Sequence, residues 1–291
     1  MKIIDGRKIS EGILTSLQEE ISKNNLAPKL AIIQIGSEEP SNVYVSMKQN
    51  AGERIGLITD IYHYEGRDIN EILLLIAELN NDKSVNGVIL QLPTPGIESR
   101  EILNNIAPEK DVDGLTMYSL GNIWHNSSNR VEHIGATPKA IIAILEEIGL
   151  EEGVRLHEML TGKNIVIINH NILIGRPLAG ILLNYNATVS ILHEFTQDIN
   201  QYLGNADIII SATGKRIIDS RNSTILKQDV IIIDSGYSLI DGKSVGDVEL
   251  DAVKEKASYI TPVPGGIGPI AVAMLMKNTV NACINQQKAL T

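Results

Sequence analysis

Residues 162–196 read GKNIVIINHNILIGRPLAGILLNYNATVSILHEFT, and this stretch indicates the fold more clearly than any other part of the chain. Ile165–Ile168 is a short apolar run typical of a buried parallel strand, and Thr188–Leu192 is a second, β-branched run. Gly175 and Pro177 mark a turn, and the residues after them have the composition of a helix. The order strand, turn, helix, strand predicts a βαβ unit of the kind that binds nucleotides.

An acidic residue, Glu194, follows the second of these strands. In a dinucleotide fold, a carboxylate at this point can accept hydrogen bonds from an adenosine ribose hydroxyl. A phosphate on that ribose would meet the same carboxylate, and such a like-charge contact costs several kcal/mol. If the chain binds a dinucleotide, we therefore expect NAD rather than NADP.

The turn between the first strand and the helix lacks the fingerprint G-x-G-x-x-G. It reads NHNILIG over residues 169–175, so only Gly175 remains to let the backbone approach a pyrophosphate. Asn169 and Asn171 enter left-handed conformations more readily than most residues, so a tight turn is still feasible. On this stretch alone, nucleotide binding and a βαβ layer that only packs both stay open.

Composition excludes several classes of function. The chain has 291 residues, which suffices for two domains, and its 43% hydrophobic and 21% charged residues are typical of a soluble globular protein. One Trp, one Phe and eight Tyr leave a mainly aliphatic core, as parallel α/β sheets favour. A net charge of −10 argues against binding to nucleic acid or to an anionic membrane.

Cysteine, histidine and apolar patterns point to an ordinary intracellular protein. Cys283 is the only cysteine, so no intrachain disulfide can form, which suits a reducing cytoplasm. The six histidines show no metal-ligand spacing, so we expect no metal site. No apolar run of about 18 residues appears, and the N-terminus is too polar for a signal peptide. We expect a cytoplasmic location.

Strand-like runs alternate with helical stretches along most of the chain, which predicts parallel α/β sheets. We place one sheet before about residue 140 and another after about residue 160. The predicted domains are 1–140, completed by a returning C-terminal helix within 270–291, and a Rossmann-like domain over 141–269. Further strands are predicted at Leu30–Ile35, Ile58–Tyr64, Gly87–Leu92, Asp207–Ser211 and Val230–Asp234, and helices at Ser41–Ile55, Ile69–Asn80, Thr137–Ile148, Leu178–Asn184 and Pro269–Gln287.

Tyr44 and Lys48 lie four residues apart on a predicted helix, so both side chains project from one face. A phenol beside an ammonium suits a site where a ring is stacked and a proton is moved, and burial can bring the lysine pKa toward working pH. An exposed helix face explains most Tyr-x-x-x-Lys pairs equally well. Short-chain dehydrogenases also use this pair, but there it follows the nucleotide-binding unit, whereas here it precedes that unit.

Three other segments carry candidate chemistry. Gln91 ends a predicted strand, and ligands of α/β sheets gather at such ends, although it could simply be a satisfied amide. The Asp111-Val112-Asp113-Gly114 run could present a carboxylate to a ligand or form only a turn. The loop 262–269 holds three prolines and three glycines, a stiff segment suited to lying against a planar ligand.

Taken together, the motifs resemble those of the methylenetetrahydrofolate dehydrogenase/cyclohydrolase family, nearly end to end. That resemblance implies two α/β domains with a folate cleft between them, usually in a homodimer joined through the nucleotide domains. It also implies oxidation of 5,10-methylenetetrahydrofolate with a nicotinamide cofactor, followed by hydrolysis to 10-formyltetrahydrofolate. The matching motifs are Ser41-x-x-Tyr44-x-x-x-Lys48, Gln91-Leu92-Pro93, Lys110-Asp111-Val112-Asp113-Gly114, Gly175-Arg176-Pro177, Val245-Gly246-Asp247-Val248 and Thr261-Pro262-Val263-Pro264-Gly265-Gly266-Ile267-Gly268-Pro269.

The resemblance also implies roles for individual residues. Lys48 would be the main catalytic residue in the hydrolytic step, Gln91 would hydrogen-bond Lys48, Tyr44 would stack along the folate, and Asp113 would hold the pterin. The substrate would also meet the loop residues Pro264, Gly265 and Gly266. The cofactor would be bound by Asn169, His170, Asn171, Gly175, Pro177, Glu194, Ser211, Thr213 and Gly214.

The departures from the family pattern concentrate on the cofactor side. Members that use NADP commonly have Gly-Arg-Ser where this chain has Asn169-His170-Asn171, and Ser where it has Glu194. Both losses agree with the carboxylate argument for NAD. Other family motifs differ at Asn50, in Gly135-Ala136-Thr137-Pro138, in Asp234-Ser235-Gly236-Tyr237-Ser238 and in Gly268-Pro269-Ile270-Ala271.

We therefore expect a folate-interconverting enzyme that prefers NAD. Two alternatives stay open: an enzyme with cyclohydrolase activity alone, and a paralogue that binds folate or nucleotide without turnover. Retention of Tyr44, Lys48, Gln91 and Asp113 argues against the second, because a pure binder has no need of the lysine.

Overall fold

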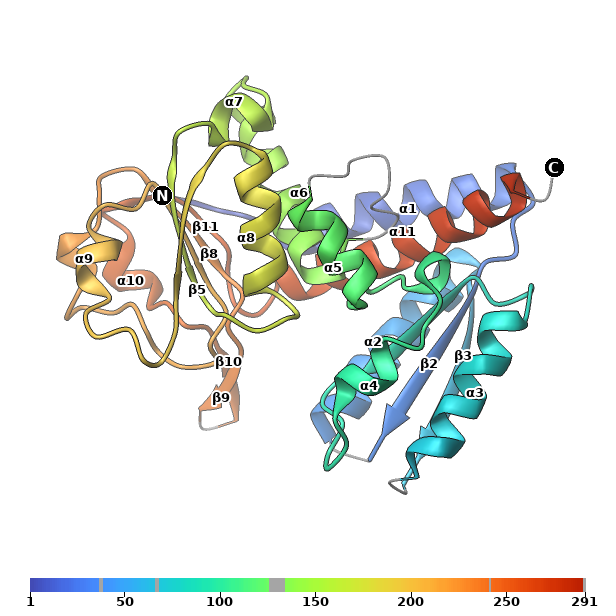
Figure 1. Cartoon of the computed structure of the whole chain (residues 1–291). Helices are drawn as coiled ribbons and strands as arrows, with labels where there is room; N and C mark the ends of the chain where they lie inside the picture. Colours follow the sequence, from blue (N-terminus) through green and yellow to red (C-terminus); the bar gives the residue numbers. More distant parts are fainter. Residues whose placement is uncertain (37–38, 66–67, 126–133, 241, 290–291) are drawn as a thin grey trace. The chain divides into compact units, whose positions relative to one another are not determined.

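The structure is a computed structural model, and the chain in it folds into two compact units, each discontinuous in sequence (Figure 1). The first unit contains Ser10–Ala136 and Val272–Thr291, and the second unit contains Met1–Ile9 and Thr137–Ala271. The structure describes residues 1–36, 39–65, 68–125, 134–240 and 242–289.

Residues 1–9 depart from the predicted division, which placed them in the first domain. Strand β1 (Lys2–Ile3) pairs in parallel with β11 (Ala257–Ile260), and the backbone N–H of Ile4 donates to the Ile260 carbonyl over 2.9 Å. A strand of two residues leaves no periodic signal in the sequence, and its partner lies more than 250 residues away along the chain. The pairing therefore had no local signature.

The sheet of the first unit runs in the order β3-β2-β4 with all strands parallel, which confirms the predicted strands there. Its central strand is buried on both faces, since Leu30, Ala31, Ile32 and Ile33 are fully enclosed. Leu30 and Ile32 pack with apolar residues of three helices, which therefore cover one face: α1 (Gly6–Lys23), α2 (Glu39–Ile55) and α11 (Ile267–Lys288). The strands are β2 (Lys29–Ile35), β3 (Ile58–Tyr64) and β4 (Gly87–Gln91).

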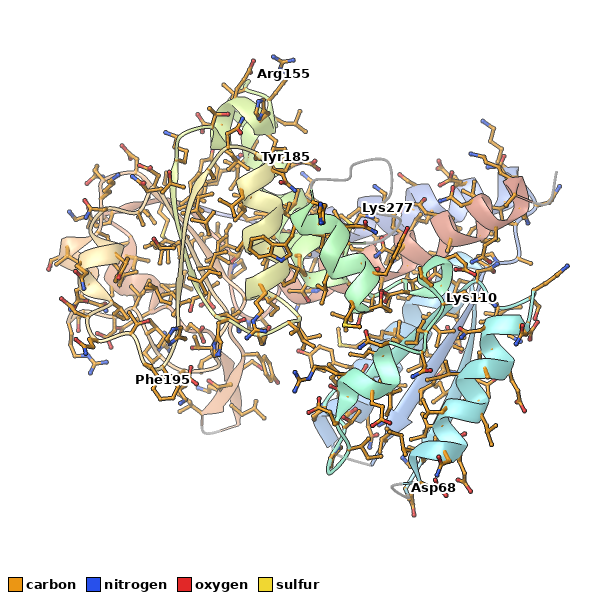
Figure 2. All side chains as sticks on the ribbon, viewed as in Figure 1. Asp68, Lys110, Arg155, Tyr185, Phe195 and Lys277 are labelled. Carbon is orange, nitrogen blue, oxygen red and sulfur yellow. The ribbon has the colours of Figure 1, made fainter. Side chains whose placement is uncertain are left out.

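The helices of the first unit carry polar groups at their ends. Figure 2 labels Asp68 and Lys110 at opposite ends of α3. The Asp68 carboxylate accepts from the Asn70 N–H, whereas the buried Lys110 ammonium donates to the carbonyls of Leu79 and Asp82, at 2.6 and 2.7 Å. Its helical segments are α1 (Gly6–Lys23, which starts in the second unit), α2 (Glu39–Ile55), α3 (Ile69–Asn81), α4 (Ser99–Leu103), η1 (Pro108–Lys110), α5 (Met117–Trp124) and α11 (Ile267–Lys288).

The sheet of the second unit is parallel and runs in the order β1-β11-β8-β7-β5-β6. From β5 the chain passes to β6 at one edge and then returns past β5 to β7. This reversal is the topological switch point, where nucleotides bind in open α/β sheets. The strands that continue the order are β5 (Asn164–Ile168), β6 (Thr188–Leu192), β7 (Ile208–Ser211) and β8 (Val230–Asp234), with a separate hairpin of β9 (Ser238–Ile240) and β10 (Lys243–Val245).

The predicted βαβ unit is confirmed, with its helix starting three residues earlier than expected, at Gly175. That helix, α8, contacts both β5 and β6. Residues 149–161 contain the end of α6 and one short helix, α7. The helical segments of the second unit are α6 (Ala136–Glu151), α7 (Leu156–Leu160), α8 (Gly175–Asn184), α9 (Asn200–Leu203), η2 (Ser223–Ile225) and α10 (Leu250–Val253).

Helix α11 has the length and composition of a membrane span, although the sequence contains no unbroken apolar run of that length. Two thirds of the apolar window, 67%, is buried inside the protein. Its residues Leu275, Met276 and Val280 belong to the core of the first unit. The apolar character of α11 is that of a core helix.

Candidate active site

In the first unit, α2 and β4 bring Lys48 and Gln91 into contact. The Lys48 ammonium donates to Oε1 of Gln91 over 2.7 Å, and Gln91 is only 8% exposed. Nε2 of Gln91 donates to the Leu92 carbonyl over 2.9 Å. This second bond fixes which way the amide faces, because only the oxygen can accept from Lys48. Since a neutral amine also carries N–H donors, Gln91 can hold Lys48 in either protonation state.

Asp113 is the charged neighbour of Lys48. Burial lowers the pKa of Lys48, and the negative charge of Asp113 opposes that effect. Burial also raises the pKa of Asp113 to about 6, with Lys48 acting to lower it and Asp111 to raise it further. Burial thus disfavours the charged form of both groups and moves their pKa values toward each other.

The two aspartates of the 111–114 run have different roles. Asp111, at 1% exposure, accepts from the N–H groups of Leu115 and Thr116 and from the Ser119 hydroxyl, at 3.1, 2.9 and 2.7 Å. It therefore builds the turn that leads into α5. Asp113 is half-buried, and its carboxylate acts on Lys48. The run thus forms a turn, and it also places the Asp113 carboxylate where it acts on Lys48.

Tyr44 lies one turn before Lys48 on α2 and is 40% exposed. Val43 and Met47 on the same helix are also exposed, at 54% and 38%. Together these side chains form an exposed apolar strip beside Lys48. The sequence pointed to Tyr44 alone, because aliphatic residues on a helix are ordinarily assigned to the core.

Gln34 supports the site from beside Gln91, and no sequence pattern singled it out. It pairs with Gln91 across the β2–β4 register and is 4% exposed. Its Nε2 donates to Asn42 Oδ1 over 2.6 Å and to Ser41 Oγ over 3.4 Å, so it ties the start of α2 to the end of β2. The available signal was a glutamine near the end of an otherwise aliphatic strand.

In the second unit, the turn after β5 is held by its own asparagines. Asn169 Oδ1 accepts from the N–H groups of Asn171 and Gly175, at 2.9 and 3.1 Å, and its Nδ2 donates to the Ala212 carbonyl over 2.7 Å. Asn171 Oδ1 accepts from the N–H groups of Leu173 and Ile174. Asn169 therefore links the two loops of the switch point, and both asparagines occupy amides at the start of α8.

Gly175 is required by close packing. A Cβ at this position would lie 2.0 Å from the Asn169 carbonyl oxygen. Pro177 lies in the first turn of α8, where its missing N–H costs nothing. These two residues shape the entry of the helix.

Glu194 follows β6 and lies near a histidine of the switch loop. Its Oε2 is 3.7 Å from Nδ1 of His170, and both side chains are well exposed, at 60% and 45%. The His170 ring lies 5.2 Å from that of His193, which in turn meets the edge of Phe195. Phe195, labelled in Figure 2, is 79% exposed. The chain thus places an acidic residue, two imidazoles and an aromatic ring at this strand end.

The segment after β7 brings Ser211 and Thr213 to a buried carboxylate, Asp247. The Ser211 hydroxyl donates to Asp247 over 2.5 Å, and the Thr213 N–H and hydroxyl donate to it over 2.6 and 2.9 Å. Gly214 has a φ of +69°, which favours glycine. The hydroxyl of Ser211 is therefore engaged with Asp247 in a fully buried position.

The loop at Pro264–Gly266 is tightly packed against the N-terminal segment. A Cβ on Gly6 would lie 1.9 Å from the Gly266 carbonyl oxygen, and Gly265 has a φ of +103°. This loop lies in the second unit, as do the switch-point residues, whereas Tyr44, Lys48, Gln91 and Asp113 lie in the first.

Among the described residues, no group of three or more His, Cys, Asp or Glu side chains is arranged to hold a metal ion. His133 lies outside those residues.

Comparison with known proteins covers almost the whole chain. Residues 4–113 match the catalytic domain of the tetrahydrofolate dehydrogenase/cyclohydrolase family, and residues 135–287 match its NAD(P)-binding domain. The bifunctional protein FolD of Lactobacillus acidophilus is 39% identical over 284 residues, which is 96% of each chain.

Solved structures agree with this match. The bifunctional methylenetetrahydrofolate dehydrogenase/cyclohydrolase FolD of Campylobacter jejuni superposes with a TM-score of 0.90 at 37% identity, over 98% of this chain and 99% of that one. The Trypanosoma brucei enzyme, solved with NADP cofactor and an inhibitor, gives 0.88 at 29% identity over 98% of each chain.

Proposed function

Because the chain belongs to the tetrahydrofolate dehydrogenase/cyclohydrolase family, we propose that it oxidises 5,10-methylenetetrahydrofolate with NAD⁺ in preference to NADP⁺ and hydrolyses the methenyl product to 10-formyltetrahydrofolate. The contact between Lys48 and Gln91, with Asp113 acting on the same ammonium, carries the proposal for catalysis. Glu194, which follows β6, is the observation that supports a preference for NAD⁺.

Hydrolysis requires a group that can take and return a proton as water adds to the methenyl carbon. Burial lowers the pKa of Lys48, so its amine is available as a base closer to neutral pH than a free lysine would be. Gln91 keeps the Lys48 nitrogen in place as the proton moves. Tyr44 and the exposed Val43 and Met47 offer an apolar surface for the flat rings of the folate.

Asp113 has the properties needed to hold the pterin. A carboxylate can accept hydrogen bonds from the amine and ring N–H edge of a pterin, and a pKa raised to about 6 keeps it ionised at pH 7. Its charge also stabilises the ammonium form of Lys48, so binding and proton transfer draw on the same carboxylate.

The second unit fits a dinucleotide at its ribose end. The strand order supplies a switch point, and Glu194 stands at the end of the next strand, where it can accept from ribose hydroxyls. The bound nicotinamide supplies an acceptor for the hydride from the folate. The chain has to orient that ring and disfavour the 2′-phosphate of NADP, which would meet the Glu194 carboxylate.

The first experiment is a spectrophotometric assay with 5,10-methylenetetrahydrofolate and equal concentrations of NAD⁺ or NADP⁺. Faster turnover with NAD⁺ supports both the reaction and the role of Glu194. A preference for NADP⁺ would retain the activity and contradict the cofactor assignment. Hydrolysis of methenyltetrahydrofolate is assayed separately.

One observation favours a second candidate, an enzyme with cyclohydrolase activity alone. Asn169 and Asn171 already occupy amides at the start of α8 that could otherwise face a pyrophosphate. If neither dinucleotide supports oxidation while methenyltetrahydrofolate is hydrolysed, this candidate replaces the first. Folate binding without either reaction would instead identify a binding paralogue. A homodimer in the cytoplasm remains our prediction from the family resemblance, and sedimentation analysis tests the dimer.

A further inference from the structure

Two carboxylates are buried together in the second unit, next to the switch point. Asp247 is fully enclosed and Asp234 is 3% exposed. Asp234 ends β8, and Asp247 follows the β9–β10 hairpin. The hydrolytic and hydride-transfer steps described above make no direct use of either group. Burying two charges is costly unless their acceptor positions are filled, so their partners indicate what they hold in place.

Among the described residues, the donors to the Asp247 carboxylate belong to a single segment, Ser211–Lys215. Oδ2 accepts from the Ser211 hydroxyl, the Thr213 N–H and the Thr213 hydroxyl at 2.5, 2.6 and 2.9 Å, and Oδ1 accepts from the Lys215 N–H at 3.0 Å. This segment leaves β7 at the switch point, and its Ala212 carbonyl accepts from Asn169. One carboxylate therefore sets the conformation of one of the two loops that meet there.

Asp234 fixes Asp247 in turn. Oδ1 of Asp234 accepts from the N–H groups of Gly236 and Asp247 at 2.9 and 3.1 Å, and Oδ2 accepts from the Val248 N–H at 2.9 Å. Each carboxylate also rests on a glycine of the other's segment. A Cβ on Gly236 would lie 1.9 Å from Asp247 Oδ1, and a Cβ on Gly246 would lie 2.0 Å from Asp234 Oδ2.

We propose that Asp247 is a positioning residue for the nicotinamide dinucleotide, acting through the segment Ser211–Lys215, with Asp234 as its support. This inference rests on the proposed function and on the family resemblance, which implies that Thr213 and Gly214 line the cofactor site. It also changes the role of Ser211: its hydroxyl holds Asp247 and does not contact the ligand directly. The Gly-Asp-Val sequence at 246–248 then serves the cofactor site indirectly, because Asp247 shapes a segment that binds the cofactor and does not contact the cofactor itself.

The test is Asp247→Asn, assayed in both half-reactions. An amide has one accepting oxygen, so its NH₂ group must face either the donors at Oδ2 or the Lys215 N–H, and the segment has to move. We expect the KM for the dinucleotide to rise about tenfold with a smaller change in kcat. Hydrolysis of methenyltetrahydrofolate should stay within about twofold, because Lys48, Gln91 and Asp113 belong to the other unit.

Asp219→Asn is the matched control. Asp219 is 9% exposed in the same unit and is bonded to Arg221, outside the Ser211–Lys215 segment. The dinucleotide KM of this variant should equal that of the wild type. A folded Asp247→Asn variant with an unchanged dinucleotide KM would overturn the proposal, as would an equal loss of both activities.

A second variant covers failure of Asp247→Asn to fold. Ser211→Ala removes one donor to Asp247 and should raise the dinucleotide KM about threefold, with hydrolysis unchanged; no rise overturns the proposal. If the wild type lacks dehydrogenase activity, the dehydrogenase part of the proposed function fails by itself. Calorimetric titration with NAD⁺ then decides: weaker binding by Ser211→Ala supports positioning, and no binding by the wild type overturns it.

Discussion

Lys48 and Asp113 in the first unit carry charges that burial opposes, whereas Asn169 and Asn171 in the second unit give their oxygens to nearby backbone amides. A group that must move a proton has to remain poised between two states, and burial without full compensation achieves this. A loop that must present a fixed shape benefits from having its polar atoms paired. The comparison suggests that substitutions in the first unit will affect rate, and those in the second will affect cofactor choice and stability.

The largest expected effect comes from Lys48→Met, which removes the proton-carrying amine and keeps the length of the side chain. Hydrolysis should fall by about 10³-fold while folate binding stays within about tenfold. Stopped-flow absorbance and equilibrium titration measure the two quantities. Lys83→Met, at an exposed lysine of the same unit, is the control. Unchanged hydrolysis in Lys48→Met would remove Lys48 from the mechanism.

Cofactor choice should respond next. Glu194→Ser combined with His170→Arg removes the negative charge at the end of β6 and adds a guanidinium to the switch loop. We expect the ratio of kcat/KM for NADP⁺ to that for NAD⁺ to rise about thirtyfold, or about 2 kcal/mol. Glu255→Ser, at another exposed glutamate of the second unit, should leave the ratio unchanged. No shift in the double variant would mean that Glu194 does not face the ribose.

The pH dependence of stability tests the first unit independently of its chemistry. The folded-state pKa of Asp113, about 6, lies above its ordinary value of 3.8. The folded state therefore resists ionisation, and the contribution of Asp113 to the free energy of unfolding declines as pH rises from 3.8 to about 6.

Asp113→Asn should remove this decline and be more stable than the wild type by about 1.5 kcal/mol at pH 7, even though its activity falls. The gain is smaller than the pKa shift alone implies, because Lys48 loses a counter-charge in the variant. Urea unfolding at a series of pH values measures the difference. If the free energies of unfolding of the two proteins vary with pH in parallel, ionisation of Asp113 does not destabilise the folded state.

The smallest expected effect is at Asn171, whose oxygen accepts from two amides at the start of α8. Asn171→Ala should lower the free energy of unfolding by about 1 kcal/mol, because the N–H groups of Leu173 and Ile174 lose their acceptor. Asn205→Ala, which removes an exposed bond from an asparagine side chain to the Gln201 carbonyl, should have less effect. Chemical denaturation compares them, and equal stabilities would show that water replaces Asn171.

Sequence patterns located most of the strands because each is a run of aliphatic residues between turn signals. Ile165–Ile168 and Val230–Asp234 were visible in this way. The β9–β10 hairpin, the edge strand β1 and its neighbour β11 were not predicted. Strands β1, β9 and β10 have only two or three residues, too few to show a period. The N-terminal strand was the hardest case, since only its long-range pairing defines it.

The site residues that could be predicted were those whose own side-chain chemistry and local spacing indicate a role. Lys48 and Tyr44 were marked by their spacing, and the structure contains the bond from Lys48 to Gln91 that the family resemblance implied. Gln34 and Asp247 were not predicted, because a buried glutamine or aspartate acquires its role from partners distant in sequence. Positioning residues are defined by tertiary contacts that local patterns do not encode.

The discontinuity of the two units also governs how the protein can be made. Residues 1–9 add the edge strand β1 beside β11 in the second unit. Residues 272–291 complete the core of the first unit, which begins at residue 10. During synthesis on the ribosome, residues 1–9 have no partner until β11 emerges, and the first unit lacks part of its core until α11 emerges, so early segments wait with apolar surface exposed. A simple cut near residue 136 would therefore yield two fragments, each missing an element that the other retains.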